Sequence, residues 1–346
     1  MTGDMRVLLS GSSLNNWDHV NGSATTMVGL ANALTETGVE VTWLEPGPVD
    51  EIKRVWGIQV VNQFDYNSPE DLARELPADL LIFQNYAHDF SRVAKAYRNQ
   101  GSRVFLLDDN TPKQLRSTIA TAKSVDVILS HGPDPAKILR HYLPSTEIVV
   151  FEQATDPKRF APVEEEDKKF CWDVLFVGAA DPLRRDVLEF LFFGPARRMP
   201  QFTFGLYGIG WENFLEHSEN VVYGGWIDND HLAETYARAK VVVHGTTRPL
   251  RPFDLVVNRV YDVMATGSVV LADRTKGLGR AFTPGEQIVL ASDTDEATDW
   301  IRSLVADRER RRRIAAAGRS AVLQCHTWAH RVKEIEAIYS TLKRTS

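Results

Sequence analysis

Short apolar runs alternate along the first half of the chain with segments whose apolar residues recur at helical spacing. Residues 24–37 carry apolar side chains three or four positions apart, which predicts a helix that ends at Gly38. Another helix is predicted to begin after Ser68, because a proline and two acidic residues follow this N-cap residue. The runs that predict strands are residues 6–10, 39–44, 80–83, 104–107, 125–129 and 148–151, and those that predict further helices are residues 90–99, 112–123 and 135–142.

The strand-like runs are continuously apolar, which is typical of parallel sheets that helices cover on both faces. Residues 154–169 interrupt the pattern, because they are mostly polar and contain two prolines, and we predict a linker there. The sequence therefore predicts an α/β fold of two doubly wound, Rossmann-like domains that face a cleft, with ligands outside the carboxyl ends of the strands. After the linker, strands are predicted at 174–177, 202–207, 241–244, 269–271 and 288–290, and helices at 184–197, 231–239, 255–266, 295–305 and within 308–342.

The composition is that of an ordinary globular protein, with 346 residues of which 43% are hydrophobic and 25% are charged. The net charge of −6 argues against attraction of the whole surface to nucleic acid or anionic membrane, although a local basic groove is compatible with it. The two cysteines, Cys171 and Cys325, cannot form a disulfide framework, and no metal-binding motif occurs. No apolar run reaches the roughly 18 residues of a membrane span and no signal-peptide pattern is present, so we expect a cytoplasmic protein.

One predicted helix, at residues 255–266, is apolar on nearly all sides, which indicates that it is buried. Its polar residues Asn258, Arg259 and Asp262 lie three or four positions apart and therefore share one side. A buried carboxylate needs a partner, because desolvating it alone costs several kcal/mol. The residues by themselves leave two partners open for Asp262, namely Arg259 and a ligand diol such as the two ribose hydroxyls.

Several strands of the second half end in residues suited to binding an anion. Gly178 follows a strand, and Arg184 and Arg185 come at the start of the next helix, where the helix dipole disfavours a cation unless an anion is bound. The alternative is that these arginines are solvated surface residues. His244 ends another strand, and a turn of Lys276, Gly277, Leu278 and Gly279 is expected to expose backbone N–H groups.

The first half offers fewer signals. Gly22 lies in a turn that resembles a phosphate-binding turn, but the GxGxxG spacing and the Walker lysine are missing, which argues against nicotinamide-dependent enzymes and P-loop NTPases. His88, Asp108, Asp109 and His131 lie just past predicted strand ends, and His88, Asp108 and His131 are the candidates for acid–base catalysis.

From about residue 150 to residue 342 the chain resembles the GT-B glycosyltransferases with a group 1, family 4-like C-terminal domain, and within them the CgeB-like branch. The matching stretches occur in the order that the family has, and it is this ordered set that carries the resemblance. They are residues 154–160, 173–178 with Arg184 and Arg185, 206–211, 258–267, 277–286 and 326–331.

The resemblance implies that the C-terminal domain binds a nucleotide-sugar donor. The EX7E pattern of the family matches Asp254 and Asp262 by spacing, and Asp262 would hold the ribose. Arg184 or Arg185 would hold the diphosphate, together with the amides of residues 277–279. The second basic residue of the family is not evident, and Lys276 or Arg259 would take its place. The implied organisation is an acceptor domain at 1–155, a donor domain at 170–325 and a helix at 326–346 that returns to the N-terminal domain.

The implied function is the metal-independent transfer of a sugar from a nucleoside diphosphate sugar to an acceptor, with retention of anomeric configuration and without a cofactor. Two alternatives remain open: a nucleotide-sugar epimerase of the same fold, and a non-catalytic protein that binds nucleotides or sugars. The acceptor also stays open among small molecules, glycans, proteins and modified DNA.

Overall fold

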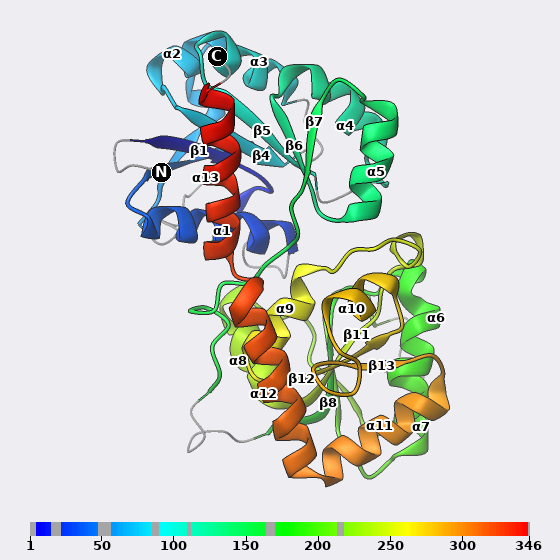
Figure 1. Ribbon diagram of the computed structural model, residues 1–346. Coiled ribbons are helices and arrows are strands. Elements are labelled where there is room, and N and C mark those ends of the chain that lie inside the picture. Colours follow the sequence, from blue (N-terminus) through cyan, green and yellow to red (C-terminus); the bar gives the residue numbers. More distant parts are fainter. Residues whose placement is uncertain are drawn as a thin grey trace. The chain divides into compact units, whose positions relative to one another are not determined.

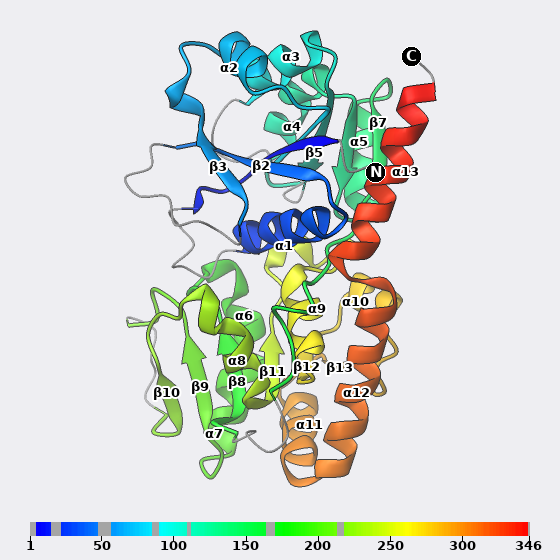
Figure 2. The ribbon, with the colours of Figure 1, turned by 90° about the vertical axis from the view of Figure 1, so that its left-hand side faces the viewer.

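The computed structural model describes residues 5–14, 22–47, 57–84, 90–108, 112–163, 170–212 and 218–344 (Figures 1 and 2). The chain forms two compact units. Among the described residues, unit 1 contains those before Ala154 and those from Trp328 onward, and unit 2 contains Ala154–Thr327. Each unit is built on one parallel sheet with helices, which confirms the predicted fold class.

Unit 1 contains seven parallel strands in the order β3-β2-β1-β4-β5-β6-β7. Strands β2 and β3 are added on one side of β1, and β4 to β7 are added on the other side. Doubly wound sheets bind ligands at the point where the direction of strand addition changes in this way. The strands are β1 (Arg6–Ser10), β2 (Glu40–Glu45), β3 (Gln59–Asn62), β4 (Leu80–Gln84), β5 (Arg103–Asp108), β6 (Val127–Ser130) and β7 (Glu147–Val150). The helices are α1 (Gly22–Glu36), α2 (Pro69–Glu75), α3 (Ser91–Asn99), α4 (Leu115–Thr121), α5 (Pro133–Tyr142) and α13 (Trp328–Arg344).

Unit 2 contains six parallel strands in the order β10-β9-β8-β11-β12-β13. The strands are β8 (Trp172–Val177), β9 (Phe204–Tyr207), β10 (Val221–Tyr223), β11 (Ala239–His244), β12 (Val269–Asp273) and β13 (Val289–Ala291). The helices are α6 (Arg185–Leu188), α7 (Gly194–Arg198), α8 (Leu232–Ala237), α9 (Asn258–Ala265), α10 (Lys276–Ala281), α11 (Thr294–Ala306) and α12 (Arg308–Cys325).

The sheet of unit 2 separates two apolar cores. Along β8, Val174 and Phe176 face the core beneath α6 and α11, and Leu175 and Val177 face the core beneath α8 and α9. Figure 1 shows these two sets of helices on opposite faces of the sheet. Because both faces are covered, successive residues of β8 from Val174 to Val177 are all buried, and this explains the continuous apolar runs in the sequence.

Some predicted elements differ from the structure for identifiable reasons. The edge strands β3 and β10 were not predicted, because they are short and only partly buried. The helix predicted at 184–197 is divided into a 3-10 turn, α6, a π-helical segment at Glu189–Phe193, and α7. Pro195 lacks an N–H group and crowds the preceding turn, which the wider π-helical turn relieves.

The predicted linker at 154–169 is wrong for residues 154–160, which pack into unit 2. Thr155 and Phe160 are fully buried in unit 2. The Thr155 N–H donates to the His326 carbonyl oxygen at 3.0 Å, and Thr155 forms a parallel bridge with Thr327. Polar composition therefore indicated a linker where a tertiary contact buries the backbone. Residues 164–169 lie outside the described residues.

The helical tail consists of α12 and α13, which break at His326 and Thr327. Helix α13 packs against α1 within unit 1, where Gly29 leaves room for the Trp328 ring. A Cβ at position 29 would lie 2.3 Å from the Trp328 Nε1 atom. No described helix combines the length and the hydrophobicity that are needed to span a membrane.

Candidate functional site

A pocket of about 400 Å³ lies at the carboxyl ends of the first strands of unit 2. The turns that follow β8, β9 and β10 form its walls, which is the usual ligand position in a doubly wound sheet. Nine residues line it: Val177, Gly178, Ala179, Arg184, Gly208, Ile209, Trp226, Ile227 and Arg259.

Two arginines share one wall of this pocket. The guanidinium carbons of Arg184 and Arg259 lie 5.9 Å and 5.7 Å from the centre of the Phe176 ring at the end of β8. Gly178 stands against both, because a Cβ at this position would lie 3.0 Å from Nη1 of Arg184 and 3.3 Å from Nη2 of Arg259. The glycine thus gives both guanidinium groups access to the end of the strand.

This arginine pair lacks a carboxylate partner. Among the described residues, no carboxylate oxygen lies within 4.0 Å of either guanidinium group, and the buried Nε of Arg184 has no hydrogen-bond partner. Burial and, secondly, the charge of Arg259 lower the pKa of Arg184 to about 10. Two neighbouring cations in a partly desolvated wall repel each other, so an anion that binds between them is strongly favoured.

His244 lies beside the arginine pair at the end of β11. It is buried, and its Nδ1 has no partner among the described residues. Burial, Arg259 and Arg184 together lower the pKa of His244 well below its ordinary value, so the imidazole is neutral. The histidine therefore adds a hydrogen-bonding group to this region without adding positive charge.

Asp262 follows Arg259 by one helical turn but does not line the pocket. Its carboxylate is 2% exposed and accepts a hydrogen bond of 2.7 Å from the Thr155 hydroxyl. Burial raises the pKa of Asp262 to about 7, although Thr155 and Arg159 act in the opposite direction. The structure thus gives this carboxylate a partner that the sequence did not suggest, and the ribose contact stays a prediction.

Asp254, the other predicted acid, is neutralised by side chains of α10. It is buried and receives a hydrogen bond of 2.6 Å from Arg280 Nε, while the Lys276 amine lies at 3.8 Å. Lys276 is therefore engaged with Asp254, whereas Arg259 lies next to Arg184. Of the two residues proposed for the second basic position, the structure favours Arg259.

The predicted anion-binding turn at residues 276–279 is a capped helix start. The Leu278 N–H donates to the Thr275 hydroxyl at 3.4 Å, and the Gly279 N–H donates to the Thr275 carbonyl oxygen at 3.1 Å. The expectation that these two amides are open to a ligand is therefore wrong. Gly277 is required for packing, because a Cβ there would lie 2.1 Å from the Leu255 carbonyl oxygen.

We expect Gly277→Ala to lower the free energy of unfolding by about 2–3 kcal/mol, because its methyl group displaces the backbone of residue 255. Gly279→Ala is the matched control, since a Cβ there meets nothing within 4 Å. Its effect should stay below about 1 kcal/mol. Urea unfolding of both variants measures the difference, and equal stabilities would contradict the packing role.

The remaining donor-site candidates lie elsewhere. Arg185 is an exposed first residue of α6, and Asn258 is the first residue of α9; neither lines the pocket. Gly22 begins α1 in unit 1 and is exposed. The pocket thus brings together Gly178, Arg184 and Arg259 from the predicted set.

Two of the predicted catalytic residues meet in unit 1. Asp108 ends β5 and accepts a hydrogen bond of 3.1 Å from Thr118. His131 follows β6 and places its Nδ1 3.0 Å from the Asp108 carbonyl oxygen. Burial lowers the pKa of His131. His88 and Asp109 lie outside the described residues.

The sequence did not point to the apolar wall of the pocket or to the partners of Asp262. Trp226 is 45% exposed and Ile209 is 58% exposed, which is unusual for side chains of this size. Both lie in glycine-containing turns after strands, and that pattern is the signal that would have identified them. Thr155 and Arg159 lie in the segment that we predicted to be a linker. Residues 154–160 carry part of the family resemblance, but nothing in the sequence pairs them with Asp262.

Residues 184–337 match a protein family described as Glycosyl transferase-like, which is less than half of the chain. No curated protein sequence matches. Among solved structures, the chain is similar to a sucrose-phosphate synthase from Thermosynechococcus elongatus, with 16% identity, coverage of 99% of this chain and 100% of that one, and a TM-score of 0.65.

Two other solved structures are similar over nearly their whole length. HepE from Anabaena, in complex with UDP and glucose, has 13% identity, covers 97% of this chain and 100% of its own, and gives a TM-score of 0.69. The catalytic domain of starch synthase IV from Arabidopsis thaliana, bound to ADP and acarbose, has 11% identity, covers 98% and 99%, and gives a TM-score of 0.69. These structures establish the GT-B fold, and together with the family match they indicate a glycosyltransferase.

Proposed function

We propose that this glycosyltransferase takes its sugar from a nucleoside diphosphate sugar whose diphosphate binds to Arg184 and Arg259. The observation that carries the proposal is the pair of guanidinium groups without a carboxylate partner at the carboxyl ends of a doubly wound sheet. Two fixed cations suit a dianionic diphosphate better than a single phosphate or a carboxylate. The family match that begins at residue 184 includes both arginines.

The opposite wall of the pocket suits a nucleobase. Trp226, Ile209 and Ile227 provide an apolar surface within the same cavity as the arginines. An exposed tryptophan ring offers a face for stacking a base, and such stacking is worth about 1–3 kcal/mol. The structures of HepE with UDP and of the starch synthase domain with ADP show that proteins of this fold bind different bases. We therefore do not assign the nucleobase of the donor, which the titration with nucleoside diphosphates described below would identify.

The arginine pair would also contribute to catalysis. As the glycosidic bond breaks, negative charge develops on the departing diphosphate, and preorganised cations stabilise that charge more than they stabilise the intact donor. A nearby neutral His244 leaves this positive potential undiminished. We further propose that the transfer is retaining, that the protein belongs to the CgeB-like branch, and that Asp262 contacts the ribose, all on the resemblance of the sequence.

Unit 1 supplies the candidates for acceptor recognition. The His131 Nδ1 faces a carbonyl oxygen and therefore carries the proton, which leaves Nε2 as a hydrogen-bond acceptor in a neutral ring. Among the described residues this buried Nε2 has no partner. A hydroxyl group is the donor that such a nitrogen would bind, so we propose a hydroxyl-bearing acceptor.

Calorimetric titration with a panel of nucleoside diphosphates, followed by transfer assays with the sugar nucleotide of the best base, tests the proposal. We expect one diphosphate to bind and the corresponding monophosphate to bind at least about tenfold more weakly, because it lacks the second phosphate group. Incubation of the donor without acceptor should leave its sugar unchanged. A new epimer under these conditions would instead indicate an epimerase, and binding without turnover over a broad acceptor panel would indicate a binding protein.

We expect transfer to continue at an undiminished rate in the presence of EDTA, because the two guanidinium groups supply the positive charge that a divalent cation would otherwise supply. Rates with EDTA, with added Mg²⁺ and with added Mn²⁺ provide the comparison. Loss of transfer in EDTA that either cation restores would contradict metal independence while leaving the donor proposal intact.

A further inference from the structure

Three buried polar atoms at the end of β11 and beside it have no hydrogen-bond partner among the described residues. They are Nε of Arg184, Nδ1 of His244 and Oγ1 of Thr247. The side chain of Arg184 comes close to this strand end, because a Cβ on Gly245 would lie 3.3 Å from its Cγ. Native proteins rarely leave buried polar atoms without a partner, since the lost hydrogen bond is costly, so these atoms point to a ligand that supplies the bonds.

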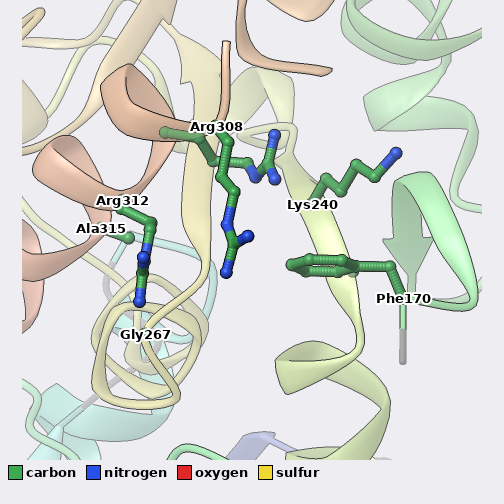
Figure 3. Close-up of a pocket in the computed structure, with 8 residues that line it drawn as sticks. Phe170, Lys240, Gly267, Arg308, Arg312 and Ala315 are labelled. Carbon is green, nitrogen blue, oxygen red and sulfur yellow. The ribbon is translucent and has the colours of Figure 1, made fainter. Parts of the chain in front are cut away.

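The other end of the same sheet offers a contrast. Figure 3 shows a pocket there, with Lys240 from β11 and Arg308 and Arg312 from α12 in its lining. Lys240 is paired with Asp173 at 2.6 Å, and Arg308 and Arg312 are also engaged within the chain. These charged side chains have partners in the protein itself, and we infer no ligand for this pocket.

The proton on His244 is placed by Thr246 and Asp273. Asp273 ends β12 and accepts a hydrogen bond of 2.8 Å from the Thr246 N–H. Burial raises the pKa of Asp273, and hydrogen bonds from the backbone and the side chain of Thr246 oppose this shift, so the Thr246 hydroxyl donates to the carboxylate. A hydroxyl has one proton, so its oxygen can only accept from Nε2 of His244, which lies 3.5 Å away. Nε2 of the neutral ring therefore carries the proton, and Nδ1 is a hydrogen-bond acceptor.

The order of the strands indicates which part of a nucleotide sugar would reach this acceptor. The apolar wall that suits the nucleobase lies after β9 and β10, and the arginine pair lies against Phe176 of β8. Strand β11 is the neighbour of β8 on the side away from β9. In a nucleotide sugar the diphosphate lies between the nucleoside and the sugar. A donor with its base at β9 and β10 therefore directs its sugar toward β11 and His244.

We propose that His244 determines the specificity for the donor sugar by accepting a hydrogen bond from the hydroxyl group on carbon 2. This inference rests on the proposed function, because it assumes that Arg184 and Arg259 hold the diphosphate. The hydroxyl on carbon 2 is the sugar hydroxyl nearest to the diphosphate, since carbon 2 is bonded to the anomeric carbon. Its oxygen would accept from Nε of Arg184, so that one group pairs two of the unpaired atoms. Because His244 is 6% exposed, the Arg184 side chain has to shift slightly to admit the hydroxyl.

The proposal predicts a class of donor. A site built to bind a hydroxyl group rejects an analogue that lacks it, because the buried acceptor then stays unpaired. A 2-deoxy sugar leaves Nδ1 of His244 in this state, and a 2-acetamido sugar brings a larger group into the narrow space beside Arg184. We therefore expect a donor sugar with a free 2-hydroxyl group.

The test uses calorimetric titration of the full chain with the nucleoside diphosphate that binds best in the panel described above, and with its sugar derivatives. These are the glucose, galactose and mannose derivatives, and then the 2-deoxy and 2-acetamido analogues of whichever binds most tightly, here called the parent. His244→Leu removes the acceptor. His244→Asn is the matched control, because its side-chain oxygen can take the position of Nδ1. Thermal unfolding without ligand checks that both variants are folded.

We expect the wild type to bind the 2-deoxy and 2-acetamido analogues at least about tenfold more weakly than the parent. His244→Leu should bind the parent about tenfold more weakly than the wild type does, with the affinity for the 2-deoxy analogue and for the free diphosphate within about threefold of wild type. His244→Asn should keep most of the preference for the parent.

The proposal is overturned if the wild type binds the parent and its 2-deoxy analogue equally, or if His244→Leu binds the parent as the wild type does. It is also overturned if none of the three sugar derivatives binds more tightly than its analogue without the 2-hydroxyl group. In each of these cases the free diphosphate still binds, and the assignment of Arg184 and Arg259 stands. If no nucleoside diphosphate binds to the wild type, the donor proposal fails first and this inference fails with it.

Discussion

Arg259→Ala is expected to lower kcat/KM for the nucleotide-sugar donor by about 10²- to 10³-fold, and Arg184→Ala by a similar factor. Each substitution removes half of the positive charge that faces the diphosphate, in a pocket where no other cation is among the lining residues. Part of the loss falls on kcat, because the charge on the leaving diphosphate grows as the bond breaks. Steady-state kinetics with varied donor separate kcat from KM.

Stability should change in the opposite direction. Arg259 lowers the pKa of Arg184, which reports repulsion between the two cations in the folded protein. Removing either one relieves that repulsion, so we expect the single variants without nucleotide to unfold at a higher temperature than the wild type. Nucleoside diphosphate should raise the unfolding temperature of the wild type and have little effect on the variants. A variant that loses both activity and stability would show that the arginines act mainly in packing.

Arg185→Ala decides between the two adjacent arginines that the sequence left open. Because Arg185 is exposed and does not line the pocket, its loss should reduce kcat/KM by less than about threefold. Arg313→Ala, on the distant α12, is the control for a general loss of charge. If Arg185→Ala is as damaging as Arg184→Ala, the diphosphate does not bind where the pocket places it.

Asp262 is expected to contribute a loss of stability as the pH rises from about 4 to about 7, whereas the buried histidines His131 and His244, whose pKa values are lowered, act in the opposite direction. The pKa of this carboxyl is about 7 in the folded protein, against an ordinary value of 3.8. Between these two values the folded protein retains a proton that the unfolded chain has lost, so raising the pH favours unfolding. The effect is complete above pH 7 and is on the order of 4 kcal/mol.

Asp262→Asn removes this titration. The difference in unfolding free energy between the variant and the wild type should therefore shift in favour of the variant between pH 5 and pH 8, while all other titrating groups cancel in the comparison. Urea unfolding of both proteins at the two pH values measures it. Thr155→Val, which removes the 2.7 Å hydrogen bond to the carboxylate, should steepen the pH dependence. Parallel behaviour of wild type and Asp262→Asn would contradict the raised pKa.

The same variant tests the ribose contact separately. If Asp262 holds the ribose hydroxyls, Asp262→Asn should weaken nucleoside diphosphate binding by about tenfold or more at pH 8, where the carboxyl is ionised, because a charge-assisted hydrogen bond is lost. If its partner is Thr155 alone, nucleotide affinity should be unchanged while the pH dependence of stability disappears. The proposal that Arg184 and Arg259 bind the diphosphate is compatible with either result.

The sequence by itself determined the architecture. Both faces of each sheet are covered, so the strands are continuous apolar runs, and helices with a single buried face show helical spacing; both patterns are local and can be read directly. Local chemistry also determined the start of α2, where the predicted N-cap Ser68 accepts a hydrogen bond from the Asp71 N–H at 3.0 Å. The edge strand β10 was not predicted, because a partly exposed strand of three residues shows no continuous apolar run.

Only the tertiary structure decided which polar residues meet. Arg184 and Arg259 are far apart in sequence, yet both lie against Phe176, whereas Arg185 is exposed and does not line the pocket. Lys276 lies beside Asp254 instead. Asp262 finds its partner in Thr155, 107 residues earlier, inside a segment whose polar composition predicted a linker. The physical reason is that periodicity reports burial within one element, while the pairing of charges depends on the register and packing of several elements, which no local pattern records.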